Sequence, residues 1–175
     1  MQARRLAAIA ALGLSLILMA GCSHPSEYDF IADFEEGQIS PQTQFGTPTG
    51  KAAFVVTKYP IAGEKRDALI TLATGEIGFD IDPVPAQASL TFGAAVSPDS
   101  ADGAEGLVAV EVDGKRQTVY RKFLDPANRE ADRRWFDETV DLSKYEGKDI
   151  KLIFATAMRG NANSDWFLWA NPQLR

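Results

Sequence analysis

The feature that most limits what this chain can fold into is an alternation of apolar residues with polar or small ones, repeated in short runs. A half-buried β-strand has this period of two, because successive side chains point to opposite faces of the sheet. The clearest runs are residues 77–82, 90–96, 108–112, 119–123 and 150–154. Asp113-Gly114 joins two of them and predicts a hairpin, since a type I′ turn needs positive φ at both central positions.

Further strand-like runs bring the expected number of strands to about nine or ten. These runs are Tyr28–Phe34, Ala52–Tyr59, Ala68–Ala73 and Trp166–Trp169. We expect helical structure only as single turns, at residues 125–132 and at residues 143–147. Many short strands joined by turns are typical of such folds, so the sequence predicts one all-β domain, residues 28–175, folded as a β-sandwich or jelly roll.

The N-terminal segment has the organisation of a secretory signal sequence. Arg4 and Arg5 precede an uncharged run, residues 6–19, that is shorter than the ~20 residues of a membrane-spanning helix. The run ends at Ala20-Gly21-Cys22, which is similar to the lipobox of bacterial lipoproteins, with Met19 where that motif usually has leucine. The alternative is an ordinary signal peptide in which Cys22 has no role.

The lipobox resemblance implies that residues 1–21 are removed and that acyl chains, palmitate among them, are attached to Cys22. More than one acyl chain makes such an anchor durable, and residues 22–27 would form the lipidated tether. Ser23, rather than Asp, follows the cysteine, which in proteobacterial lipoproteins implies sorting to the outer membrane. We therefore expect a lipid-anchored protein of the cell envelope, in the outer membrane and facing the periplasm or the cell surface.

Composition argues against several classes of function. The formal charge of −6 includes Arg4 and Arg5, so removal of the signal peptide would change it to −8. An acidic domain is a poor partner for nucleic acid. Acylation of Cys22, the only cysteine, would leave no disulfide, cysteine nucleophile or thiolate ligand. His24, the only histidine, lies beside the anchor, so we expect no Ser-His-Asp triad and no histidine-ligated zinc.

Six short segments in the second half of the chain carry a more specific resemblance. They are residues 84–92, 112–114, 123–126, 132–135, 140–147 and 165–172. Their order, over roughly residues 76–175, is similar to that of galactose-binding-domain-like jelly rolls, including modules appended to bacterial sulfatases and glycosidases. Where relatives often have Trp-Gly-(Asp/Asn)-Pro, this chain has Trp169-Ala170-Asn171-Pro172. The resemblance implies a jelly-roll β-sandwich and says little about the ligand.

Residues 32–37 resemble the Phe-Glu-Asp-Gly opening of carbohydrate-binding modules with this fold. In those modules a Glu, backbone carbonyls and an Asp near the last strand often hold a structural Ca²⁺, and the matching residues here are Glu35 and Asp165. Calcium takes about six to eight oxygen ligands, so two carboxylates with carbonyl groups would suffice. The alternative is that Glu35 is solvated at the end of a strand and Asp165 caps a turn.

A candidate ligand site follows from the chemistry of sugar binding, which needs an exposed aromatic ring with polar groups around it. If Phe136 faces the core, Trp135 points to the opposite side of the strand, next to Arg133 and Arg134. We predict that Trp135 is exposed and stacks on the ligand, with Arg133, Arg134 and, from the preceding hairpin, Tyr120 as companions. The alternative is that Trp135 packs in the core and that both arginines form surface ion pairs.

The sequence therefore predicts a non-catalytic module that binds a glycan or another component of the cell envelope. One alternative is a structural or assembly lipoprotein that docks onto a protein partner. Another is a hydrolase whose carboxylates are not recognisable among the 24 acidic residues. An exposed tryptophan with a polar rim would favour glycan binding, a broad apolar patch would favour a protein partner, and a cleft with two facing carboxylates would favour an enzyme.

Overall fold

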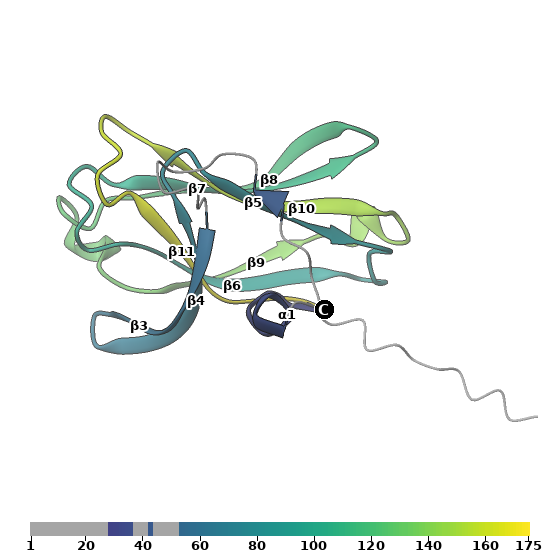
Figure 1. The fold of residues 1–175 in the computed structure, drawn as a ribbon, viewed down its shortest axis with the longest axis horizontal. Coiled ribbons are helices and arrows are strands. Elements are labelled where there is room, and N and C mark those ends of the chain that lie inside the picture. The colour runs from purple at the N-terminus through teal and green to yellow at the C-terminus, as the bar shows by residue number, and fades with distance from the viewer. Residues whose placement is uncertain (1–27, 37–41, 44–52) are drawn as a thin grey trace, which may run out of the picture.

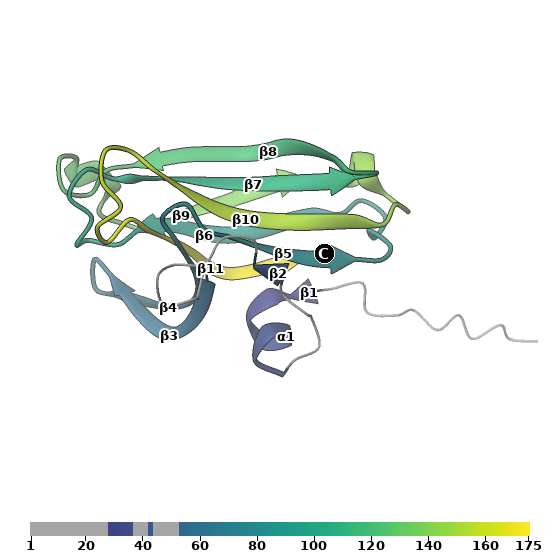
Figure 2. The ribbon, with the colours of Figure 1, turned by 45° about the horizontal axis from the view of Figure 1, so that its top comes forward.

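Two antiparallel β-sheets face each other in the computed structural model, which describes residues 28–36, 42–43 and 53–175 (Figure 1 and Figure 2). Sheet A has the strand order β3-β4-β11-β6-β9, with β1 also paired to β11, and sheet B has the order β2-β5-β10-β7-β8. The strands are β1 (Tyr28–Asp29), β2 (Gln42–Thr43), β3 (Ala53–Ile61), β4 (Glu64–Leu72), β5 (Glu76–Ile81), β6 (Ser89–Val96), β7 (Ala104–Val112), β8 (Lys115–Leu124), β9 (Phe136–Asp141), β10 (Ile150–Met158) and β11 (Trp166–Leu174). The prediction of an all-β sandwich is confirmed.

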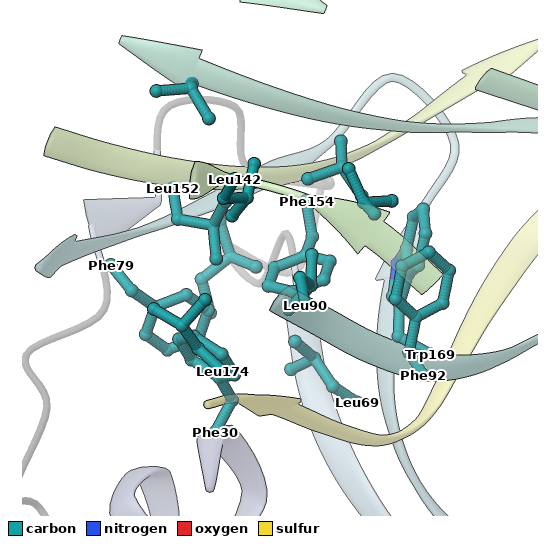
Figure 3. Packing of buried hydrophobic residues seen from close by; sticks show 14 of the residues in the cluster. Phe30, Leu69, Phe79, Leu90, Phe92, Leu142, Leu152, Phe154, Trp169 and Leu174 are labelled. Atoms are coloured by element: carbon teal, nitrogen blue, oxygen red, sulfur yellow. The ribbon is translucent and has the colours of Figure 1, made fainter. Parts of the chain in front are cut away.

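The core lies between the two sheets and is rich in aromatic rings (Figure 3). The ring of Trp169 is fully buried, with its centroid 5.3 Å from that of Phe92 and 5.2 Å from that of Phe154. Its indole Nε1 donates a hydrogen bond of 2.9 Å to Thr71 Oγ1, which lies 2.6 Å from Thr156 Oγ1. A buried polar group is stable only when it is hydrogen-bonded, so this network lets three polar side chains remain in the core.

Residues 28–34 form a strand only as far as Asp29, so the prediction of a strand through Phe34 is wrong. Helix α1 (Phe30–Glu36) follows at once, because Asp29 Oδ1 accepts hydrogen bonds of 3.1 Å from the backbone amides of Ile31 and Ala32. This is the geometry of a helix N-cap, which satisfies amides that have no partner within the helix. The helix places the buried ring of Phe30 5.0 Å from that of Phe79 in the core (Figure 3).

The hairpin of β3 and β4 is bent, and its tip curls onto the outer face of sheet A (Figure 2). The pairing of the two strands shifts between Val56 and Tyr59, where Lys58 takes a φ of 57°. Such a bulge bends a strand and increases its twist. The tip itself turns through Ala62 and Gly63, both with positive φ. The bend brings the tip over strands that are its neighbours neither in sequence nor in the sheet.

The predicted turns are confirmed. Short 3₁₀ helices occupy Glu130–Asp132 and Ser143–Tyr145, and the hairpin between β7 and β8 turns at Asp113 and Gly114, with φ values of 50° and 71°. The predicted signal peptide, the lipidated Cys22 and the tether lie outside the described residues. No helix in the described part of the chain is long and apolar enough to cross a membrane.

Candidate functional site

A polar hollow of about 320 Å³ lies on the outer face of sheet A, where β11, β6 and β9 run side by side. Gly93 of β6 and Ala170 of β11 are partners in the sheet and line this hollow. A Cβ atom added at Gly93 would lie 2.7 Å from Arg66 Nη1 and 3.0 Å from Ala170 Cβ. The hollow therefore exists because two neighbouring central strands carry very small residues at this level.

Polar side chains surround these small residues: Arg66, Thr91, Asp137, Thr139 and Asn171. The Arg66 guanidinium spans two carboxylates, with Nη1 donating to Asp137 Oδ1 at 2.5 Å and Nε donating to Glu64 Oε1 at 2.7 Å. The hydrogen bond from Arg66 holds the pKa of the Asp137 carboxyl below its ordinary value of 3.8. Asp137 is therefore ionised at neutral pH, and its side chain remains 79% exposed. The rim offers both donors and acceptors of hydrogen bonds.

Trp135 points to the outer face of sheet A, as predicted, but the prediction that it is exposed is wrong. Only 6% of the residue is exposed, because the tip of the β3–β4 hairpin covers it. The indole Nε1 donates a hydrogen bond of 3.3 Å to the backbone oxygen of Glu64, and the Arg66 guanidinium lies 5.5 Å from the ring centroid. Trp135 thus holds the hairpin against the sheet rather than offering an open stacking surface.

Tyr120, the predicted aromatic companion, lies on the inner face of sheet B and does not meet Trp135. Its ring packs against Phe92 at 5.0 Å, and its hydroxyl is buried without a hydrogen-bond partner among the described residues. Burial, with the Glu138 carboxylate nearby, raises the pKa of the Tyr120 hydroxyl far above its ordinary value of 10. Glu138 itself accepts a hydrogen bond of 2.5 Å from Lys122 Nζ. Tyr120 is therefore part of the packing at this edge of the sandwich.

The two predicted arginines do different things. Arg133 donates from Nε to the Pro126 oxygen at 2.6 Å and from Nη2 to the Ala127 oxygen at 3.2 Å, so it fixes the loop before η1, the 3₁₀ helix Glu130–Asp132. Arg134 is exposed, with its guanidinium 4.5 Å from the centroid of the Phe136 ring. The four residues predicted to form one ligand site are thus distributed over separate places, and the structure does not bring them together.

Asp165, the predicted calcium ligand, is fully buried. Its Oδ1 accepts a hydrogen bond of 2.7 Å from Ser100 Oγ, whereas Oδ2 has no partner in the described part of the chain. Asp102 Oδ1 is also buried and unpartnered. Burial raises the pKa of the Asp165 carboxyl; the hydrogen bond from Ser100 lowers it, and the negative charge of Asp102 raises it further. Two buried carboxylate oxygens without a partner, in groups whose charges influence each other, fit a bound cation.

This arrangement differs from the predicted ligand pair in its second carboxylate. The side chain of Glu35 lies outside the described part of the structure, and Asp102 is the carboxylate found near Asp165. No group of three or more His, Cys, Asp or Glu residues that could hold a metal occurs among the described residues. Any cation here would therefore need carbonyl, hydroxyl or water oxygens to complete its coordination.

Sequence reasoning missed most residues of the hollow, above all Arg66 and Asn171. One signal was present: Gly93 interrupts an alternating strand, and an isolated glycine in a strand often marks a close approach by other atoms. Nothing local identifies Arg66, because it reaches Asp137 across 71 positions of sequence through the bend of the hairpin.

No protein-family model matches the chain. A sequence relative, an uncharacterized protein of Archaeoglobus fulgidus, is 31% identical over 128 aligned residues. The alignment covers 69% of this chain but only 30% of the relative, so the chain spans less than a third of the length of that protein.

Several solved structures resemble the model. TmCBM61 in complex with beta-1,4-galactotriose has a TM-score of 0.55 and 16% identity, and the match covers 85% of this chain and 98% of that one. The K2 adhesin domain of Lys-gingipain has a TM-score of 0.51 and 12% identity, over 77% and 89% of the two chains. CBM51 of a Clostridium perfringens protein, in complex with methyl-galactose, has a TM-score of 0.50 and 16% identity, over 78% and 92%. At these identities the likeness is one of fold, and the chain has the β-sandwich fold of carbohydrate-binding modules.

Proposed function

We propose that this chain is a non-catalytic glycan-binding module and that the sugar occupies the hollow on the outer face of sheet A. The observation that carries the proposal is the hollow itself, in which small residues at the bottom are ringed by charged and polar side chains. Its volume of about 320 Å³ is at the lower end of the range for small-molecule sites, as a site for one or two sugar rings would be.

The rim provides groups suited to vicinal hydroxyls. Asp137 would accept hydrogen bonds from sugar hydroxyls, and Arg66 Nη2, which makes no hydrogen bond within the described residues, would donate one. Asn171 and Thr139, both exposed, can donate and accept. Because Arg66 and Asp137 already hold each other in place, little side-chain entropy would be lost when the ligand binds.

The solved structures with the same fold supply the choice of sugar. Two of the carbohydrate-binding modules with this fold were solved with galactose ligands, beta-1,4-galactotriose in one and methyl-galactose in the other. Fold likeness alone does not carry a ligand from one protein to another. It does make a galactose-containing glycan the first compound to test.

The described surface gives less support to the two alternative functions. Met158 is the large hydrophobic side chain that the described part leaves exposed, which gives little support to a broad apolar patch for a protein partner. A hydrolase would need a proton donor beside a second carboxylate. In the hollow, Arg66 holds the pKa of Asp137 low, so Asp137 is not suited to donate a proton, and the Glu138 carboxylate is hydrogen-bonded to Lys122.

We further propose the envelope location that the N-terminal sequence predicts, with a lipid on Cys22 holding the module at the outer membrane. We also propose a structural Ca²⁺ bound by Asp165 and Asp102, whose buried unpartnered oxygens support it. Such an ion would join the loop before β7 to the loop before β11. It would have no part in contacting the sugar at the hollow.

The test is isothermal titration of the full chain, purified in a neutral detergent, with β-1,4-galactotriose and with methyl-galactose. Thr139→Val removes one hydroxyl from the rim at nearly constant shape, and Asp137→Asn removes the charge; both should weaken binding. Asp113→Asn, the same chemical change at the distant β7–β8 turn, should bind as the unmodified chain does. Failure of the folded chain to bind either sugar, or equal binding by all variants, would contradict the proposed site.

A further inference from the structure

Six of the eight arginines among the described residues fall into two groups according to what their guanidinium groups contact. Arg66, Arg116 and Arg133 donate hydrogen bonds to carboxylates or backbone oxygens, Arg116 with two bonds of 2.8 and 3.1 Å to the Glu76 carboxylate. A second group, Arg121, Arg129 and Arg159, donates no side-chain hydrogen bond to any residue that the structure describes. Their side chains are 62%, 57% and 63% exposed.

These three arginines converge on one ring and one carboxylate. The guanidinium groups of Arg129 and Arg159 lie 5.4 and 4.7 Å from the centroid of the Phe123 ring. Arg159 and Arg121 lie 3.9 and 4.0 Å from the Glu105 carboxylate. We call this group the Phe123 arginine cluster. It brings three cationic groups together on a chain whose formal charge is −6.

The contacts within the cluster position the arginines without occupying their hydrogen-bond donors. A nitrogen–oxygen distance of 3.9–4.0 Å is beyond hydrogen-bond range, so Glu105 attracts both guanidinium groups and leaves their N–H groups free. Arg129 stands in the same relation to Asp132, at 3.9 Å. Stacking on an aromatic face also uses the plane of a guanidinium and not its edge. The N–H edges are the part that recognises planar or tetrahedral oxyanions.

The cluster lies at the end of the sandwich opposite the first described residue. Arg159 directly follows Met158, which pairs with Ala104, and Ala104 pairs with Leu124, next to Phe123. Tyr28, by contrast, pairs with Leu174 at the other end of β11 (Figure 2). The cluster is thus at the end of the domain farther from Tyr28, where the described chain begins. If Cys22 is anchored in a membrane, Tyr28 is at the end of the domain nearer to the anchor in sequence. That placement favours a glycan over the headgroups of the same membrane.

We propose that the Phe123 arginine cluster is a second binding site, which takes the carboxylate or sulfate group of an acidic glycan. That the ligand is a glycan rests on the proposed function. That the ligand is anionic rests on the arginines. One oxyanion would accept hydrogen bonds from the free N–H edges of Arg121 and Arg159, and Arg129 would add a third positive charge. The acidic substituent and a neutral galactose unit would bind at different places on the domain.

The experiment compares charged sugars with their uncharged counterparts on the full chain in neutral detergent. The ligands are trigalacturonate and its methyl ester, a sulfated galactan oligosaccharide, and β-1,4-galactotriose. We expect trigalacturonate or the sulfated galactan to bind and the methyl ester to bind much more weakly, with affinity falling as salt is raised, since exposed charges are screened over ~10 Å at 0.1 M. Arg121→Gln and Arg159→Gln should each weaken binding of the anionic ligand by about three- to tenfold.

The matched control is Arg134→Gln, which removes an exposed, stacked arginine outside the cluster and should leave affinity unchanged. If neither anionic ligand binds, or if Arg134→Gln weakens binding as much as the cluster variants do, the second site is wrong even when galactotriose binds. If the anionic ligands bind through the cluster and galactotriose does not bind at all, the second site is supported and the proposed sugar site in the hollow is wrong. Cluster-dependent binding to vesicles containing phosphatidylglycerol, without binding to either anionic sugar, would overturn the glycan as its partner.

Discussion

Two regions of this domain pair arginine with an aromatic ring and use the pair in opposite ways. Around Trp135, the ring is buried, its Nε1 is hydrogen-bonded, and Arg66 above it is held by two carboxylates. Around Phe123, the ring is only half-buried and the arginines over it have free N–H groups. Arg66 and Trp135 fasten one part of the fold to another, whereas the Phe123 arginine cluster is held in position with its donors unused. Polar groups that are paired within the protein contribute to stability, whereas exposed donors that bond only to water can be turned toward a ligand.

The same contrast extends to the loops beside the Phe123 arginine cluster. A Cβ atom added at Gly103 would lie 2.9 Å from Phe123 Cζ, so the loop that carries Asp102 packs directly against the ring. The unpartnered oxygens of Asp102 and Asp165 are therefore at the same end of the sandwich as the free arginines. Two of the three buried side-chain atoms that lack a partner among the described residues are therefore at this end of the sandwich, whereas Arg66 and Asp137 on the outer face of sheet A are paired with each other.

The largest expected effect comes from removing the two rings in turn. Trp135→Ala should lower the free energy of unfolding by about 3 kcal/mol, because it leaves a cavity beneath the hairpin and removes the ring against which the Arg66 guanidinium lies. Phe123→Ala should cost about 1 kcal/mol, since its ring is partly exposed and lies against exposed arginine side chains and the Gly103 loop. Urea unfolding at pH 7 measures both. Equal losses would show that the two regions do not differ as described.

Calcium binding should have the next largest effect on stability, and it acts at the end of the sandwich that carries the Phe123 arginine cluster. If the ion binds Asp165 and Asp102, a concentration one hundred times its Kd should stabilise the fold by about 2.7 kcal/mol. That corresponds to a rise in Tm of about 5–10 °C for a domain of this size. Asp165→Asn should abolish the rise, as measured by thermal unfolding with calcium and with chelator.

The calcium-free form gives an independent check through pH. The pKa of Asp165 is raised above 3.8 in the folded state, so folding binds a proton, and the stability this contributes below pH 3.8 is lost as pH rises through the folded pKa. In chelator at pH 7, Asp165→Asn should therefore be at least as stable as the unmodified chain. A variant that is less stable in chelator would mean that the carboxylate is satisfied by a partner other than a cation.

The Arg66–Asp137 pair should give a smaller effect of opposite sign with pH. The pKa of Asp137 is lowered, so its contribution is present above pH 3.8 and is lost as pH falls through the folded pKa. The carboxylate is largely exposed, which limits the contribution to about 0.5–1 kcal/mol. Asp137→Asn should flatten the pH dependence of urea unfolding below pH 4 and leave that above pH 6 unchanged in shape.

How much of this could be predicted from the sequence depends on how local each feature is. The alternation of apolar with polar or small residues correctly predicted β5, β6, β7 and β10, because the period of two of a strand is visible directly in the sequence. It failed at Phe30–Glu36, where the apolar residues also fit a strand and the deciding feature is one carboxylate, that of Asp29, capping two amides. A short apolar segment does not distinguish strand from helix by its period alone.

The candidate sites were harder to predict because they depend on contacts between distant segments. The orientation of Trp135 followed correctly from the strand period, but its burial depends on a hairpin whose tip, at Glu64, lies 71 positions earlier in the chain. Arg133 and Arg134 are adjacent and alike in the sequence, and only the position of the Pro126–Ala127 carbonyls separates them. Side-chain identity and spacing carry no record of such contacts.

The smallest expected effect comes from making the same change, arginine to glutamine, at Arg133 and at Arg134. Arg133→Gln should lower the free energy of unfolding by about 1 kcal/mol, because it removes two hydrogen bonds from a charged donor to the loop before η1. Arg134→Gln removes an exposed guanidinium whose described contact is with the Phe136 ring, and should change stability by less than about 0.5 kcal/mol. Urea unfolding of the two variants side by side needs no ligand and no knowledge of function. A larger loss at Arg134 than at Arg133 would mean that hydrogen bonding to backbone oxygens does not separate the structural arginines from the free ones, and the distinction on which the Phe123 arginine cluster rests would fail with it.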